Sequence, residues 1–186
     1  MSLKRRHILR RVAKGFMALA LLTMPGPRIA AQTIRKPETP YEVRAVFLYK
    51  FAQFTEWPKE AFADENAPFV FGILGKDPFG KDIDIIKGAT LKGRKLEVKY
   101  FSKVKEVKTC HILFISDSEE KWLPEILKAL ENTSILTVGE MDRFVERNGV
   151  LNILPGREKR PYEINQAAAE KARLRIHSSL LASKNH

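Results

Sequence analysis

The chain has 186 residues, 44% hydrophobic and 30% charged, and its 33 basic and 22 acidic side chains give a net charge of +11. This length fits a single domain with one hydrophobic core. Residues 1–31 hold seven of the basic side chains and none of the acidic ones, so the remainder has 26 against 22, a net charge of +4. An excess this small, spread along the sequence, argues against a nucleic-acid-binding protein.

Residues 1–31 have the pattern of a secretory signal peptide. A basic stretch (1–14) precedes a mostly apolar stretch (15–24), and small residues follow at Ala30 and Ala31. The apolar run, about ten residues, is shorter than the roughly 20 that span a bilayer. We predict cleavage after Ala31, with Ala30 as the alternative, and export to the periplasm. The general secretory route is favoured, although residues 4–10 also resemble a twin-arginine signal.

We therefore expect three parts: the signal peptide (1–31), a polar linker (32–40) and one domain (41–183) that does not span the membrane after cleavage. The domain opens with a helix that ends at Pro58, because a residue before proline avoids the α region. At 100° per residue its apolar side chains form two stripes on roughly opposite sides. One stripe contains Val43, Phe47, Phe51 and Phe54, and the other contains Ala45, Leu48, Tyr49 and Ala52.

A helix that is apolar on two sides packs against a sheet with one side and is covered on the other. The cover is expected to be either residues 59–68 or a partner protein. The candidate partner-binding residues are Tyr49, Phe51, Phe54 and Trp57.

Buried strands and short helices alternate through the rest of the domain. Continuous apolar runs predict strands at 69–74, 110–115 and 135–138, and alternation predicts another at 96–101. Short helices are predicted at 81–86, 104–109, 141–147 and 166–173. A longer helix is predicted from 117 to about 130, and Asp117 and Glu120 at its start are spaced as a capping pair. A Pro155-Gly156 turn predicts a hairpin of strands 150–154 and 161–165. This order indicates an α/β domain, with a layered, mainly parallel sheet flanked by helices and an edge β-hairpin.

Residues 75–82 come close to the nucleotide-phosphate loop G-x-x-x-x-G-K-[ST]. Asp82 replaces the hydroxyl that would bind Mg²⁺, and Pro78 lacks a backbone N–H, so we predict a tight strand-to-helix turn and not a nucleotide hydrolase. In open α/β sheets, ligands bind beyond the carboxyl ends of the strands. The loops there define a candidate crevice for a small polar molecule: Gly75, Asp77, Phe79, Gly80, Ser116, Asp117 and Gly139. Helix capping is the alternative role for Ser116 and Asp117.

Residue types that support catalysis are scarce. Cys110 and His111 are adjacent, so in a strand their side chains point to opposite faces and cannot form a thiolate pair. Neither zinc-ligand spacing nor a G-x-S-x-G elbow occurs. We predict a protein that is not an enzyme and holds no metal or cofactor. Cys110 is expected to be a buried thiol, with an intermolecular disulfide as the alternative, and Asn152 and Asn165 are expected to bond the adjoining loops.

Five blocks of sequence, in this order and spacing, resemble the YfiR family of Gram-negative periplasmic regulators. They are residues 43–52 with Glu56-Trp57-Pro58, residues 72–80, residues 110–116, residues 136–139 and residues 163–165. The resemblance covers about residues 41–181. It implies a sandwich-like α/β domain that restrains an inner-membrane diguanylate cyclase by binding the periplasmic sensor domain of the cyclase, which lowers cyclic di-GMP and biofilm formation. Related domains are joined to histidine kinases. In some members of the family, disulfides tune the activity. In this chain only Cys110 matches a family cysteine, so regulation through an internal disulfide is not expected here.

The sequence thus predicts a periplasmic regulatory binding protein. Its expected partner is the periplasmic domain of a diguanylate cyclase or sensor kinase, and homodimer formation is left open. The alternative is a periplasmic small-molecule sensor that uses the loops at the strand ends.

Overall fold

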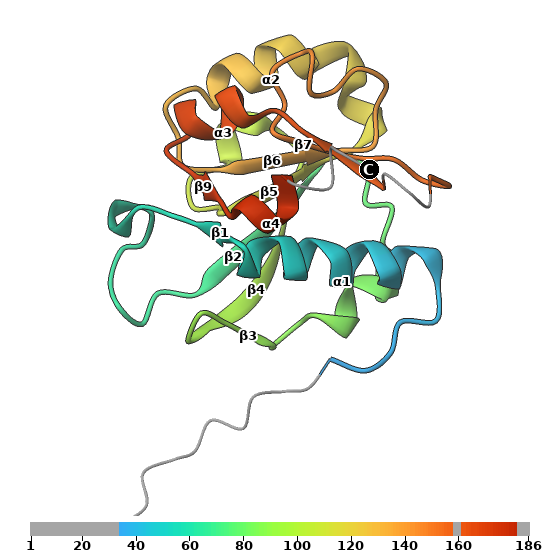
Figure 1. Ribbon diagram of the computed structural model, residues 1–186, viewed down its shortest axis with the longest axis vertical. Coiled ribbons are helices and arrows are strands. Elements are labelled where there is room, and N and C mark those ends of the chain that lie inside the picture. Colours follow the sequence, from blue (N-terminus) through green and yellow to red (C-terminus); the bar gives the residue numbers. More distant parts are fainter. Residues whose placement is uncertain (1–33, 158–160, 182–186) are drawn as a thin grey trace, which may run out of the picture. The chain divides into compact units, whose positions relative to one another are not determined.

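The computed structural model describes residues 34–157 and 161–181. The predicted signal peptide lies outside the described residues. The described part contains a seven-stranded sheet, with helices on its two faces, and a separate two-stranded sheet (Figure 1). The predicted α/β class is confirmed.

The order of the large sheet is β3-β4-β2-β5-β6-β7-β8, and its five central strands run parallel. These central strands are β4 (Arg94–Phe101), β2 (Phe69–Leu74), β5 (Ile112–Ile115), β6 (Leu136–Gly139) and β7 (Leu151–Ile153). The two edge strands, β3 (Thr90–Leu91) and β8 (Tyr162–Ile164), are antiparallel to their neighbours. The predicted edge hairpin is therefore present as β7 and β8, with Leu151 opposite Ile164.

Helix α1 (Pro40–Gln53) is capped by Thr39, whose hydroxyl oxygen accepts a hydrogen bond from the Glu42 backbone N–H (3.1 Å). The helix ends at Gln53, earlier than predicted, because the next residues form strand β1 (Thr55–Glu56). That strand pairs antiparallel with β9 (Arg175–Ile176), which lies far away in the sequence. Tertiary pairing thus overrides the helical pattern near Pro58.

The remaining helices are short. The 3-10 helices are η1 (Lys59–Ala61), η2 (Gly80–Ile85), η3 (Val104–Glu106) and η4 (Asp117–Trp122), and the α-helices are α2 (Leu123–Ala129), α3 (Gln166–Lys171) and α4 (Ser178–Leu181). The predicted long helix after 117 is therefore η4 followed by α2, with Pro124 in the first turn of α2. The helix predicted at 141–147 is a series of turns.

The capping predicted for Asp117 and Glu120 is wrong. No side-chain capping bond occurs at the start of η4 among the described residues. The Glu119 N–H instead donates to the Ser116 carbonyl (2.8 Å), because 3-10 geometry satisfies that donor within the backbone.

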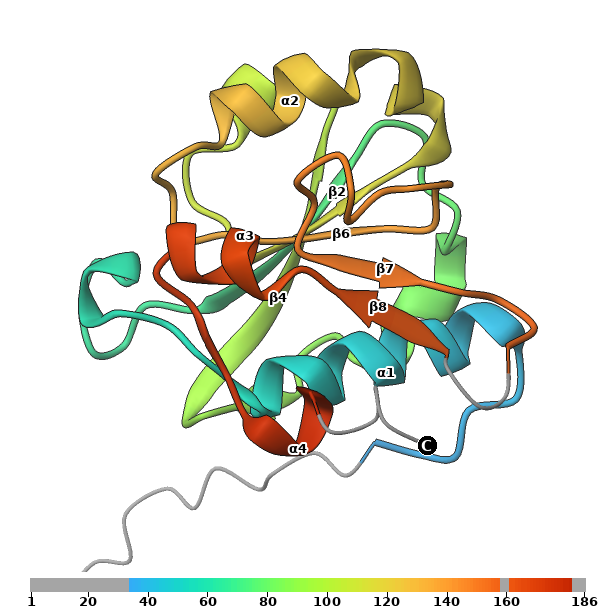
Figure 2. The ribbon, with the colours of Figure 1, turned by 45° about the horizontal axis from the view of Figure 1, so that its top comes forward.

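The hydrophobic core has two parts, one on each face of the large sheet. Figure 2 shows α1 and α2 on opposite sides of the sheet. Phe71 and Ile73 belong to the part that contains α1, whereas Leu74 and Leu113 belong to the part that contains α2. Strand alternation divides the residues in this way.

Candidate partner-binding surface

The loops at the strand ends, where a ligand crevice was predicted, bond to one another. The Lys76 backbone N–H donates to the Ser118 hydroxyl (2.9 Å). Gly75 has a φ of 88°, and a Cβ there would lie 2.5 Å from the same Ser118 oxygen, so only glycine fits without displacement. The Asp77 carboxylate accepts from the backbone N–H groups of Phe79 (2.8 Å) and Gly80 (3.1 Å). The Gly80 amide expected to hold a ligand is therefore engaged within its own turn.

Three other residues of the predicted crevice are buried. Phe79 packs edge-on against Phe71 and Phe114 in the core. Ser116 is buried, and Gly139 is buried against the ring of Phe144. Asp117 is exposed. In this structure the residues of the predicted crevice thus serve mainly packing and internal hydrogen bonding.

An ion pair that the sequence did not reveal joins α1 to this same edge of the sheet. Arg44 pairs with Glu140, which follows β6, and their side chains are only 17% and 11% exposed. Burial raises the pKa of Glu140, the charge of Arg44 opposes that rise, and the Asp117 carboxylate adds to it. The Arg44 guanidinium also lies 4.6 Å from the centre of the Tyr41 ring. The positive charge of Arg44 is therefore already compensated.

The four candidate partner-binding aromatics differ in their accessibility. Phe51 is 1% exposed and belongs to the core, so it cannot contact a partner in this structure. The Tyr49 hydroxyl donates to the Thr90 carbonyl (2.8 Å), and the Trp57 indole N–H donates to the His111 carbonyl (3.2 Å). Phe54, at 44% exposed, is the most accessible of the four.

The edge hairpin covers the middle of the first apolar stripe of α1. Tyr162 of β8 places its ring 5.3 Å from Phe47 and 4.9 Å from Phe51. The two ends of the stripe, Val43 and Phe54, remain 52% and 44% exposed. The cover on this stripe thus comes from β8.

Residues 59–68, one of the two covers expected from the sequence, pack on a neighbouring aromatic cluster. Phe62 stacks on the His111 ring, with ring centres 4.3 Å apart, and lies 6.2 Å from Phe69. Trp57 meets the same Phe69 edge-on at 4.9 Å. This segment therefore covers the surroundings of Trp57, whereas Tyr49 borders a separate hollow.

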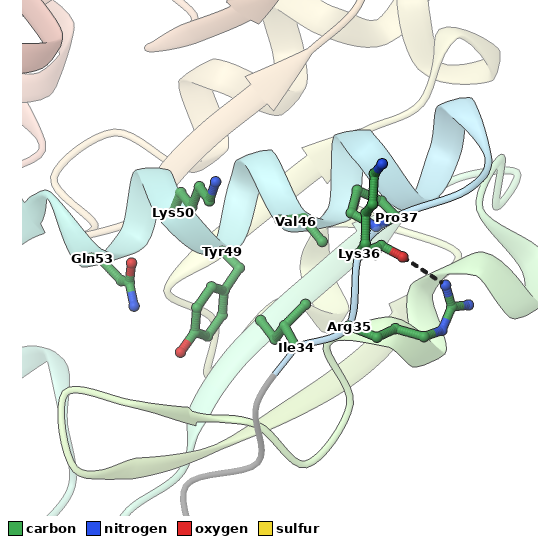
Figure 3. A pocket seen from close by; sticks show the side chains of 8 residues that line it. All are labelled: Ile34, Arg35, Lys36, Pro37, Val46, Tyr49, Lys50 and Gln53. Carbon is green, nitrogen blue, oxygen red and sulfur yellow. Dashed lines mark hydrogen bonds between the residues drawn. The ribbon is translucent and has the colours of Figure 1, made fainter.

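That hollow, of about 460 Å³, lies between α1 and the segment just before it (Figure 3). Its lining residues are Ile34, Arg35, Lys36, Pro37, Val46, Tyr49, Lys50 and Gln53. Arg35 bonds to the buried carboxylate of Glu42, which lowers the pKa of Glu42 and fixes the segment to the helix.

A second hollow, of about 340 Å³, lies on another flank of α1. Its lining residues come from the N-terminal half of α1 and from the β7–β8 hairpin: Pro40, Val43, Arg44, Phe47, Ile153, Leu154, Pro155, Gly156, Arg157 and Pro161. Eight of these ten residues are apolar or glycine. We call it the hairpin hollow. Sequence patterns could not reveal it, because its two walls are more than a hundred residues apart in the chain.

Cys110 and His111 lie on opposite faces of the sheet, as predicted. Cys110 packs in the α2 part of the core, and burial raises the pKa of its thiol to about 12. His111 is buried beside Phe62 and Phe69, and burial lowers its pKa to about 4. At neutral pH neither is ionised. Among the residues that the structure describes, no group of three histidine, cysteine or acidic side chains is arranged to hold a metal ion.

Comparison of the amino-acid sequence with known proteins found a family match. No relative was found among curated proteins. In the described part of the chain, no helix is long and apolar enough to cross a membrane. The family described as YfiR/HmsC-like matches residues 41–183, a stretch that includes both α1 and the β7–β8 hairpin. The chain belongs to the YfiR/HmsC-like family.

Proposed function

We propose that this protein is a periplasmic regulator that restrains a membrane-bound diguanylate cyclase by binding the cyclase's periplasmic sensor domain. The observation that carries this proposal is the family match over residues 41–183. The signal-peptide pattern of residues 1–31 supports export to the periplasm. A regulator of this kind lowers cyclic di-GMP through contact with its partner.

The state of the ionisable side chains supports a binding role for the protein. Cys110 is buried with a pKa of about 12, so the thiolate that a nucleophile requires is scarce at neutral pH. His111 has both ring nitrogens bonded within the fold. Glu140 is paired with Arg44. The surface of the folded domain is therefore a better candidate for activity than any of these groups.

The predicted alternative, a small-molecule sensor at the strand-end loops, has weaker support. The Gly80 and Lys76 amides already donate to Asp77 and Ser118, respectively. A ligand at this edge would have to replace those hydrogen bonds, each of which contributes about 1 kcal/mol.

Deletion of the gene, followed by measurement of cellular cyclic di-GMP, tests the proposal. We expect the concentration to rise and to return to normal when the full chain is supplied. A version that lacks residues 1–31 is the matched control, and it should fail to restore the concentration because it is not exported. The mature protein, used as bait on solubilised inner membrane, should recover a cyclase. Unchanged cyclic di-GMP, with neither a cyclase nor a sensor kinase recovered, would overturn the proposal.

A further inference from the structure

The hairpin hollow is an apolar depression at the surface. It lies between the N-terminal half of α1 and the turn after β7, two segments that lie beside each other in Figure 2. Val43 on its α1 wall is 52% exposed. The opposite wall is formed by Ile153, Leu154 and the Pro155-Gly156 turn. Covering this apolar surface would be favourable, at about 25 cal/mol per Å² removed from water.

The residues of positions 32–186 that lie outside the described ranges offer no large apolar side chain to fill the hollow. After residue 31, the residues beyond the described ranges are 32–33 (Gln-Thr), 158–160 (Glu-Lys-Arg) and 182–186 (Ala-Ser-Lys-Asn-His). Not one of these ten residues has a large apolar side chain. A group that fills the hollow would therefore come from another molecule.

The charges around the hollow indicate the character of that molecule. Two arginines line the hollow, and one of them, Arg44, is paired with Glu140. The other, Arg157, is exposed and has no ion pair with any residue that the structure describes. An acidic group beside an apolar one would thus match the hollow in charge as well as in polarity.

The shape favours a protruding side chain of a protein over a free small molecule. Small-molecule sites are generally about 300 to 1,000 Å³ and enclose most of the ligand surface. The hairpin hollow is at the low end of that range, at about 340 Å³, and Val43 on its wall is half exposed. Protein interfaces commonly place an apolar or aromatic anchor in such a depression, with charged pairs at the rim.

A second copy of this chain fits less well than a different protein. In a two-fold dimer the same patch meets itself. This arrangement would bring the two Arg157 side chains toward each other, with like charges that repel. An acidic, apolar segment on a different protein avoids this conflict.

We propose that the hairpin hollow receives an apolar side chain from the periplasmic domain of the regulated enzyme, with a neighbouring aspartate or glutamate of that domain paired to Arg157. This inference rests on the proposed function and identifies the surface that performs it. Val43 supplies apolar contact, and Arg157 supplies the charge.

This surface is tested by a binding titration. The full mature protein is titrated with the purified periplasmic domain of the cyclase that the bait experiment recovers from the membrane. Val43→Gln removes the apolar contact and Arg157→Glu reverses the charge. We expect each to raise Kd about tenfold or more, the size typical of an interface anchor, whereas Arg157→Lys should retain most of the affinity. Added salt should weaken binding by the wild type more than by Arg157→Glu.

Two matched controls lie elsewhere on the surface. Trp122→Gln alters an apolar residue in η4 that is as exposed as Val43, at 52%, and Arg175→Glu reverses an exposed arginine in β9. Both should leave Kd within about twofold of the wild type. Thermal melting of each variant verifies that it folds. A photo-crosslinking amino acid at position 43 or 122 locates the contact with the partner, and this result does not depend on the stability of the Val43→Gln or Arg157→Glu variant. The crosslink from position 43 should map to a peptide with an apolar residue next to an aspartate or glutamate.

The possible failures are distinguishable. In two cases the wild-type protein binds the purified cyclase domain, so the proposed function stands, but this surface assignment is wrong. In the first case, the crosslink forms only from position 122. In the second case, both controls weaken binding as much as Val43→Gln and Arg157→Glu. A crosslink from position 43 into a second copy of the chain would likewise overturn it. If wild-type protein binds no cyclase or kinase domain, the proposed function fails and this inference fails with it.

Discussion

His111 has a neutral ring that is fully engaged on both sides. Its Nδ1 accepts from the Val70 backbone N–H (2.9 Å), and its Nε2 lies 3.1 Å from the Ala61 carbonyl, to which it donates. The rings of Phe62 and Phe69 stack on it at 4.3 and 4.8 Å. Protonation of Nδ1 would set a donor against the Val70 donor, and the charge of Arg94, whose guanidinium lies over the Phe62 ring, adds to the penalty. The fold therefore requires the neutral imidazole.

This requirement predicts a loss of stability in mild acid. The pKa of His111 is lowered from 6.5 to about 4, so between these values the unfolded chain binds the proton more readily than the folded one. The free energy of unfolding should therefore fall as the pH falls from 6.5 to 4, by up to about 3 kcal/mol from this residue. In His111→Gln, which keeps an acceptor and a donor but does not titrate, that contribution should disappear.

Urea unfolding at a series of pH values measures the effect as the difference between wild type and variant. His177→Gln is the control, because His177 is exposed. It should keep the wild-type dependence on pH. Parallel curves for wild type and His111→Gln would contradict the assignment.

At the scale of elements, one amide side chain both starts α3 and anchors the preceding turns. The Asn165 Oδ1 accepts from the Ala168 N–H (2.9 Å), and its Nδ2 donates to the Val145 carbonyl (2.7 Å). Asn152 acts similarly from β7, donating to the Met141 carbonyl (2.9 Å). The predicted role of these two asparagines in bonding the adjoining loops is confirmed. Because α3 has only six residues, it depends on such contacts more than on its own helical propensity.

Substitution of Asn165 should separate its two roles. Asn165→Ala removes the cap and the bond to Val145, and we expect a loss of about 1 to 3 kcal/mol in the free energy of unfolding. Asn165→Ser keeps a capping oxygen but is too short to reach Val145, so it should lose less. Gln166→Ala, at an exposed neighbouring site, should change stability by about 0.5 kcal/mol or less. Equal losses for alanine and serine at position 165 would show that the cap contributes nothing.

At the scale of the whole molecule, the C-terminal part of the chain closes over the end of α1. Strand β9 pairs with β1, with Ile176 opposite Thr55, and the His177 N–H donates to the Phe54 carbonyl (2.9 Å). In α4, Leu180 and Leu181 pack against the α1 part of the core. Elements β9 and α4 therefore connect the C-terminal end of the described chain to α1 and to the strand that follows it.

Truncation after Leu174 should destabilise the whole domain. It removes β9 and α4, so it exposes apolar surface of the α1 core and breaks the pairing with β1. We expect a decrease of at least about 2 kcal/mol in the free energy of unfolding. Truncation after Leu181, which keeps both elements, is the control and should unfold like the full chain in urea. If the two truncated proteins unfold at the same urea concentration, the C-terminal closure is not important for stability.

The sequence by itself determined six of the seven strands of the large sheet and the class of fold, because the signals for them are local. Residues 69–74 are a continuous apolar run and are a buried strand over that same range. The strand predicted at 110–115 begins at Ile112, so Cys110 and His111 precede β5, but they still pack on opposite faces of the sheet as the two-residue period predicted. The Pro155-Gly156 turn predicted the hairpin.

Only the tertiary structure decided where α1 ends, what covers it and where the surface is hollow. The end of α1 depends on pairing between β1 and β9, and its cover depends on Tyr162. Arg44 and Glu140 are 96 residues apart in sequence, so neither carries a local sign of the other. Periodicity reports which side of an element is apolar, but the group that packs against that side is set by contacts distant in the chain.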